Sequence, residues 1–162
     1  MSQMFRALVT VAAGCAAALL SATQSLAAPA VPNGETSFIE GSAGEYCPFA
    51  VSIEVVSAAK ERPGSTSDNL ILTGPARITV TNTTAEPDVS RTYNISGPTF
   101  IDTTSGSNVL VLTGPALILQ PASLNIGEPF LITTSGRVTF TENNTIDSIQ
   151  GRITHDICAE LG

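Results

Sequence analysis

The chain has 162 residues, of which 43% are hydrophobic and 13% are charged, so its length and composition fit one folded domain. Fourteen acidic residues outnumber seven basic ones, and the formal net charge is −7. This balance lacks the basic surface on which nucleic-acid binding depends, and it lacks the Lys and Arg surplus that draws proteins to anionic lipid. One His and no Trp leave little material for a metal cluster or an aromatic sugar platform. We therefore expect no cofactor, no metal and no nucleic-acid partner.

The N-terminal segment is typical of a secretion signal. Arg6 is the only charged residue before Glu35, an apolar run occupies residues 7–20, and small residues stand at positions 25 and 27. We predict that residues 1–27 are a signal peptide and that the protein is secreted to the extracellular space. The apolar run is shorter than the roughly 20 residues that a membrane-spanning helix requires, so no membrane span is expected.

The sequence after the signal segment predicts an extended arm followed by one β domain. Residues 28–44 are rich in Pro, Gly, Asn and Ser, which predicts an extended N-terminal arm ahead of a single domain at residues 45–162. Val, Ile and Thr dominate the domain, and polar turns divide it. The strands are expected at residues 49–56, 69–81, 89–103, 109–120, 130–141 and 146–154. A short helical turn, with Asp156 as its N-cap, is expected at residues 156–161.

Two cysteines remain after the signal segment, and they lie near the two ends of the patterned region. Cys47 and Cys158 are 111 positions apart. In an exported chain such a pair predicts one disulfide bond. Closing a loop of about 100 residues stabilises a fold by about 4.7 kcal/mol in the chain-entropy model.

A short motif recurs in the middle of the expected strands. The sequence L-T-G-P-A occurs at residues 72–76 and again at residues 112–116, and related glycine motifs lie at residues 95–98, 134–137 and 149–152. Glycine weakens a strand unless it serves a bend or a close approach, and proline cannot donate to the ladder. We therefore predict an all-β, antiparallel meander whose strands bend at their glycines, with a barrel-like form. The alternative divides each stretch into two short strands and gives a β-sandwich.

Three arginines follow these central glycines and are candidate ligand-binding residues. Arg77, Arg137 and Arg152 lie on different expected strands, one to three residues after a glycine. If the bends align, three guanidinium groups would gather at one level and either clamp a carboxylate ligand or pair with internal acids. The alternative is that all three point outward and cover the sheet with their apolar stems.

Four short motifs, in this order, resemble a group of small secreted actinobacterial proteins that have no assigned activity. They are Cys47-Pro48-Phe49, the Asn-Ile-Ser-Gly-Pro run at residues 94–98, the Thr-Ser-Gly-Arg run at residues 134–137, and the Asp-Ile-Cys-Ala run at residues 156–159. The resemblance implies export and a β-rich domain, and it assigns no catalytic residue.

Two functional hypotheses follow from the sequence. The first is a secreted, non-enzymatic β module that binds a small ligand or an extracellular partner, because the chain shows no catalytic motif. The second is a secreted hydrolase or isomerase on a β-barrel, with scattered carboxylates and His155 as its chemical groups. An open cavity that places one of the three arginines beside an acid would favour a ligand or enzyme site over a filled interior.

Overall fold

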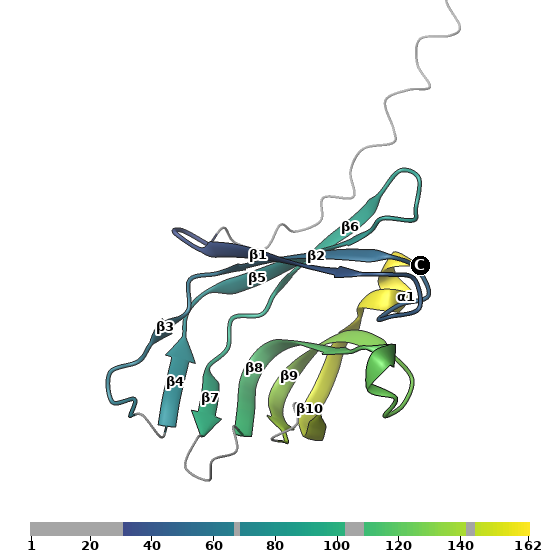
Figure 1. The fold of residues 1–162 in the computed structure, drawn as a ribbon. Coiled ribbons are helices and arrows are strands. Elements are labelled where there is room, and N and C mark those ends of the chain that lie inside the picture. Colours follow the sequence, from purple (N-terminus) through teal and green to yellow (C-terminus); the bar gives the residue numbers. More distant parts are fainter. Residues whose placement is uncertain (1–30, 67–68, 103–108, 142–144) are drawn as a thin grey trace, which may run out of the picture.

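The computed structural model describes residues 31–66, 69–102, 109–141 and 145–162. These residues form two antiparallel sheets and two short helical elements (Figure 1). Sheet A contains, in spatial order, β1 (Glu35–Gly41), β2 (Val51–Ser57), β5 (Ala76–Asn82) and β6 (Val89–Asn94). Sheet B contains β10 (Ile146–Asp156), β9 (Phe130–Phe140), β8 (Val109–Gln120), β7 (Thr99–Asp102), β4 (Asn69–Thr73) and β3 (Lys60–Glu61). The helical elements are η1 (Ala122–Leu124), after β8, and α1 (Ile157–Leu161), after β10.

The expectation of an all-β, antiparallel fold is confirmed. Across the described ranges the two sheets stay separate and form no closed barrel, which agrees with the sandwich alternative. The expected signal peptide at residues 1–27 lies outside the described residues. Within the expected arm at residues 28–44, β1 pairs with β2 along its whole length and forms an edge of sheet A. In the described part of the chain, neither helix has the length and apolar character needed to cross a bilayer.

The glycine-centred stretches divide into two kinds. The stretches at residues 69–81 and 89–103 each break at their glycine, and the chain passes between the sheets: β4 and β7 pair in sheet B, whereas β5 and β6 pair in sheet A. The three later stretches remain continuous strands that curve under sheet A (Figure 1). The sheets form a sandwich, in which two stretches divide at their glycines and three bend without dividing.

β8 stays continuous although it contains a Gly-Pro step. The Thr113 N–H donates to the Pro98 carbonyl oxygen at 3.0 Å, so this side of β8 faces β7. Alternate residues of a strand face the same neighbour, so the Pro115 nitrogen faces the same side as the Thr113 nitrogen. β7 begins only at Thr99, so it does not extend far enough to lie beside Pro115. A proline with no ladder acceptor to satisfy costs the strand nothing.

The curved strands bend at one common level. In the register of sheet B, Gly114 lies opposite Gly136, and Gly136 lies opposite Gly151. Gly97 adjoins the same row, because a Cβ atom on Gly114 would meet the Gly97 Cα at 3.7 Å. We call this row of four residues the glycine crease. The predicted bends at the glycines are thus present in these strands, and they lie at one level.

Gly136 shows why the crease requires glycine. Its φ is 139°, a region that other residues rarely adopt, and a Cβ atom there would clash with the Gln150 carbonyl and with the Gly151 Cα. A methyl group at this position would therefore push β9 and β10 apart at the bend.

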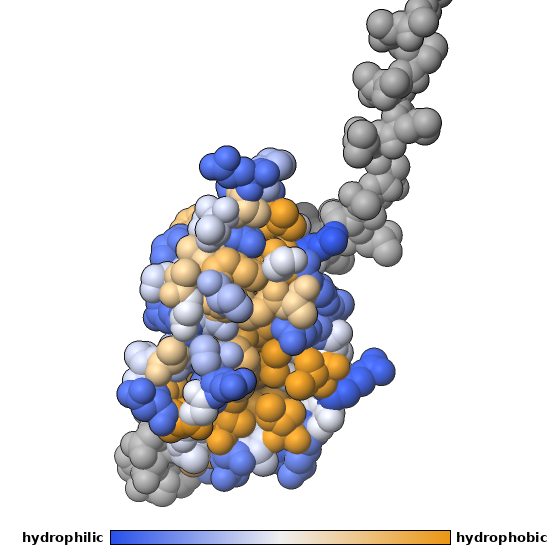
Figure 2. All heavy atoms as spheres, turned by 90° about the vertical axis from the view of Figure 1, so that its right-hand side faces the viewer, coloured by the Kyte–Doolittle hydropathy of each residue, from blue (hydrophilic) through white to orange (hydrophobic). Residues whose placement is uncertain are grey.

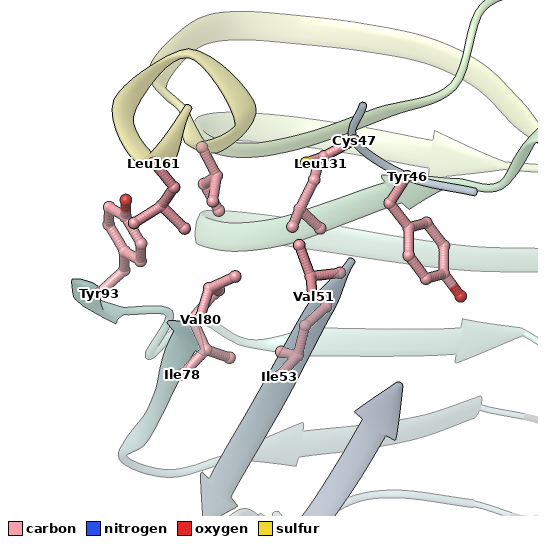
Figure 3. Packing of buried hydrophobic residues seen from close by; sticks show 10 residues of the cluster. Tyr46, Cys47, Val51, Ile53, Ile78, Val80, Tyr93, Leu131 and Leu161 are labelled. Atoms are coloured by element: carbon pink, nitrogen blue, oxygen red, sulfur yellow. The ribbon is translucent and has the colours of Figure 1, made fainter. Parts of the chain in front are cut away.

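The main core lies between sheet A and the curved upper parts of β8 and β9 (Figure 3). Its fully buried aliphatic members come from β2, β5, β9 and α1: Val51, Ile53, Ile78, Val80, Leu131 and Ile157. Burial of each such side chain contributes about 1.5–3 kcal/mol. A second apolar cluster lines the concave side of the bend and contains Ala116, Ile118, Ile132 and Val138. The crease therefore gives β8 and β9 two apolar faces.

Three bonds hold α1 against the sheets. The predicted disulfide is confirmed, with 5.3 Å between the Cα atoms of Cys47 and Cys158. The side chain of Asn82, which is buried, donates from Nδ2 to the Leu161 carbonyl oxygen at 2.9 Å. The expected N-cap also forms, since the Asp156 carboxylate accepts from the Ala159 N–H at 3.1 Å. These bonds connect α1 to the segment before β2, to β5 and to β10.

The crease predicts a specific effect of Gly136→Ala. We expect this substitution to lower the free energy of unfolding by about 3 kcal/mol or more, because it combines an unfavourable φ with a backbone clash. The matched control is Gly44→Ala: Gly44 also has a positive φ, 86°, but nothing lies within 4 Å of a Cβ atom there. Its cost should be only about 1–2 kcal/mol. Equal losses in urea denaturation would show that the crease is not close-packed.

The disulfide gives a second prediction. Cys47→Ala, Cys158→Ala and the double variant should each lose about 2–5 kcal/mol of unfolding free energy, and the three losses should be equal because each removes the same bond. Urea denaturation under non-reducing conditions measures this. A double variant that matches the stability of the unreduced wild type would contradict a structural role for the bond.

Candidate functional site

A polar pocket opens where the two sheets diverge, between β6 of sheet A and β9 and β10 of sheet B. Its volume is about 740 Å³. Arg91 and Tyr93 enter it from β6, and Arg152 and His155 enter it from β10. Glu160 closes one end from α1. The pocket thus collects cationic, acidic and aromatic groups from segments that are far apart in the sequence.

A carboxylate connects two of these groups at the end of the pocket. Glu160 Oε1 lies 2.8 Å from His155 Nδ1, and Glu160 Oε2 accepts a hydrogen bond from the Tyr93 hydroxyl at 2.9 Å. The rings of Tyr93 and His155 are tilted against each other, with 5.0 Å between their centroids. Each carboxylate oxygen therefore has one partner, and the imidazole is held with Nδ1 toward the acid.

Local structure explains how these groups meet. The Asp156 cap starts α1 directly after β10, and the helical turn brings Glu160 back beside His155. A register shift in β10 between Ile153 and His155 places His155 opposite Thr133 of β9. Such a bulge changes the direction in which the following side chains point.

Burial of the Tyr93 ring raises the pKa of its phenol well above the ordinary value of 10.0, and the hydrogen bond to Glu160 adds to this shift. The positive charge of Arg91 acts in the opposite direction. Burial also raises the pKa of the Tyr46 phenol, with a further contribution from the charge of Glu45. Tyr93 therefore stays a neutral donor at neutral pH.

The two arginines of the pocket have free donor groups. Neither Arg91 nor Arg152 forms a hydrogen bond or an ion pair with any described residue, and the one ion pair found among those residues is His155–Glu160. Glu160 is already bonded to His155 and Tyr93. The guanidinium groups can thus bind an anion from solution by donating hydrogen bonds to it.

The structure separates the three arginines that the sequence grouped. Arg152 lines the pocket, whereas Arg77 and Arg137 do not. Arg77 lies on β5 between Val56 and Asn94, and its Nε atom is buried without a hydrogen-bond partner. Arg137 is exposed on β9 opposite Gln150. Only one member of the predicted set is therefore at this site.

Sequence reasoning missed Arg91, Tyr93 and Glu160. Tyr93 and Arg91 are two residues apart on β6, so one face of that strand carries both, but nothing local relates them to β10. The one feature of the sequence that could have predicted part of this site is the position of His155 just before the Asp156 cap and of Glu160 one helical turn after it. An N-cap between them predicts a turn that brings the acid back toward the imidazole.

The repeated L-T-G-P-A motif has a different place in the fold. Both copies line a smaller cavity of about 200 Å³ between the sheets, through Leu72, Gly74, Leu112 and Pro115. Most of the side chains around this cavity are apolar. The repeat therefore marks the corner where strands bend or change sheets, as its Gly and Pro content predicted.

Among the residues that the structure describes, no group of three or more His, Cys, Asp or Glu side chains could hold a metal ion. In comparisons with known proteins, the chain matches no family model, no curated protein and no solved structure. The functional argument therefore depends on the geometry of the pocket.

The raised pKa of Tyr93 predicts a loss of stability at high pH. In the unfolded chain tyrosine ionises near its ordinary value of 10.0, while folded Tyr93 keeps its proton. The stabilisation is thus complete below about pH 10 and disappears as the pH rises further, because the unfolded state then binds fewer protons. Tyr93→Phe should reduce this alkaline loss and remove the later of the two phenol titrations, measured by phenolate absorbance. Tyr46→Phe, the control, should leave that later titration in place; a Tyr93 titration near 10 would contradict the site geometry.

Proposed function

We propose that this protein is an exported β-sandwich module that binds a small anionic ligand in the pocket between β6 and β10. The observation that carries the proposal is the pair of guanidinium groups, Arg91 and Arg152, which come from different sheets and have no acidic partner among the described residues. A ligand with carboxylate or phosphate groups would supply that partner.

The chemistry of the pocket favours an anion over a neutral ligand. Guanidinium groups bind planar carboxylates and phosphates through two parallel hydrogen bonds, which gives both strength and orientation. The chain as a whole carries a net charge of −7, so two free arginines in one concave site form a local exception. Thr133 and Thr154, whose hydroxyl oxygens lie 2.8 Å apart, add polar groups to the pocket wall.

Two features support export. The pattern at residues 1–27 is typical of a signal peptide, and the Cys47–Cys158 disulfide persists in oxidising compartments. N-terminal sequencing of protein from the culture medium of its host should find a chain that starts near Ala28. Retention of Met1 on the exported protein would contradict this.

Anion binding is tested with citrate and with inorganic pyrophosphate as probes, by isothermal titration calorimetry at low salt. Arg91→Gln and Arg152→Gln should each weaken binding about tenfold or more, because a hydrogen bond to a charged group contributes about 1.5–3 kcal/mol. Added salt should weaken it further, since both arginines are exposed. The two probes distinguish a carboxylate site from a phosphate site.

The matched control is Arg137→Gln, because Arg137 is an exposed arginine of the same sheet outside the pocket. This variant should bind both probes like the wild type. If all three substitutions weakened anion binding equally, the effect would come from the loss of one positive charge anywhere on the protein, and a specific pocket would be contradicted. Failure of both probes to bind at millimolar concentration would also contradict the proposal.

A second candidate is an enzyme in which His155 acts as a general base. The observation in its favour is the 2.8 Å contact between His155 Nδ1 and Glu160, an arrangement in which an acid orients an imidazole. In such an enzyme His155→Ala would abolish turnover of an ester or glycoside substrate while the protein stays folded. Binding of an anion without turnover would favour the non-enzymatic module.

A further inference from the structure

β10 presents an open strand edge. It is the outermost strand of sheet B, with β9 on one side and no described strand on the other (Figure 1). Residues 149–156 are all exposed, and this run includes two large apolar side chains, Ile149 at 38% and Ile153 at 59% exposure. Unpaired backbone groups beside exposed isoleucines form a template for another strand.

The bend in β10 limits what can pair with it. β10 bends where Gly151 lies in the crease opposite Gly136. A straight strand would leave the ladder at this bend, so a partner must bend at the same point. A second copy of β10 meets this requirement in one antiparallel register. A two-fold axis that runs perpendicular to the sheet, midway between the Gly151 residues of the two copies, relates the two bent strands and keeps the direction of the bend.

We propose that two copies of this chain associate through antiparallel pairing of their β10 strands, with Gly151 of each copy opposite Gly151 of the other. The two B sheets then form one continuous sheet with one continuous crease. This proposal is independent of any ligand in the pocket.

The side chains support the same register independently of the bend. Centring the pair on Gly151 places Ile149 opposite Ile153 of the second copy, and by symmetry Ile153 opposite Ile149. Within its own sheet, Ile149 lies opposite Val138 and Ile153 lies opposite Thr134. The isoleucine pairs thus extend the concave face that holds Val138, and Figure 2 shows hydrophobic residues gathered on the side of the molecule toward which these strands curve. Cross-strand pairs of β-branched residues stabilise a sheet.

Neighbouring registers are less favourable. In an antiparallel pair, a residue that points its backbone N–H and C=O toward the partner strand must lie opposite a residue that does the same. Two copies of one strand can therefore pair only in registers in which some residue lies opposite its own copy, and neighbouring registers differ by one in the number of that residue. A pair centred on Gln150 would set Ile153 against Asp147, and a pair centred on Arg152 would set two arginines against each other. Both also misalign the bends. Centring on Gly151 instead sets Arg152 against Gln150 of the second copy.

Two register shifts limit the length of the ladder. They lie between Ile146 and Ser148 and between Ile153 and His155, so β10 is regular from Ser148 to Ile153. Bulges of this kind end strand pairing. The ladder is therefore short, and we expect the dimer to dissociate on dilution.

The first test is analytical ultracentrifugation of the disulfide-bonded protein over a dilution series from millimolar to micromolar. The wild type should show a mass that doubles at high concentration. Ile153→Lys should remain monomeric, because it buries an ammonium group against Ile149 of the second copy. The matched control is Ile126→Lys, which replaces an isoleucine of 51% exposure in the loop after η1 and should still dimerise. A wild type that is monomeric throughout, or an Ile153→Lys protein that dimerises normally, would overturn the proposal.

The second test reads the register directly. Gln150→Cys and Arg152→Cys proteins are prepared separately, mixed and oxidised. Mixed disulfide-linked dimers should form faster than either self-linked dimer, because only the Gly151-centred register sets residue 150 opposite residue 152. Predominant Arg152→Cys self-linking would indicate a pair centred on Arg152, and predominant Gln150→Cys self-linking would indicate one centred on Gln150; either result would overturn the assigned register. Both positions are exposed, so the variants should fold.

Discussion

Close backbone contact at the glycine crease is the constraint on which the rest of this fold depends. Gly114, Gly136 and Gly151 lie side by side across three strands, and Gly97 adjoins them. Because no side chain separates the backbones there, β8, β9 and β10 bend together and bring their upper parts under sheet A. The bend gives the main core its lower layer and gives sheet B its concave apolar face.

The C-terminal helix links this architecture to the pocket. The disulfide and the Asn82 hydrogen bond anchor α1 to segments of the fold that precede it by many residues. Glu160 on the same helix contacts both His155 and Tyr93. The bonds that stabilise the helix therefore also set the position of the acid, so a loss of the disulfide should disturb the pocket as well as the stability.

β10 serves two roles in these proposals because its two faces differ. Arg152 and His155 contribute to the polar pocket, whereas Ile149 and Ile153 continue the concave apolar face. Alternation along the strand separates Arg152 from Ile149 and Ile153, and the register shift between Ile153 and His155 turns His155 away from the face of Ile153. Gly151 permits the bend at the centre of the strand, and the proposed two-fold axis passes between the Gly151 residues of the two copies. The pocket and the isoleucine pairs of the proposed interface thus share a strand without sharing a face.

The sequence by itself determined the β content, the disulfide, the cap of α1 and the presence of bends at glycines, because alternation, cysteine pairing and the backbone properties of Gly and Pro are local signals. It did not determine which stretches break: Gly-Pro interrupts the ladder after Thr73 but not in β8, where the proline nitrogen faces a side without a partner strand. Nor did it show that Arg152 would meet Arg91, Tyr93 and Glu160 while Arg77 and Arg137 would not. These outcomes depend on strand order, on register and on the bulge before His155, and a shift of one residue turns a side chain to the opposite face of a sheet. Only the tertiary structure could therefore assemble the pocket.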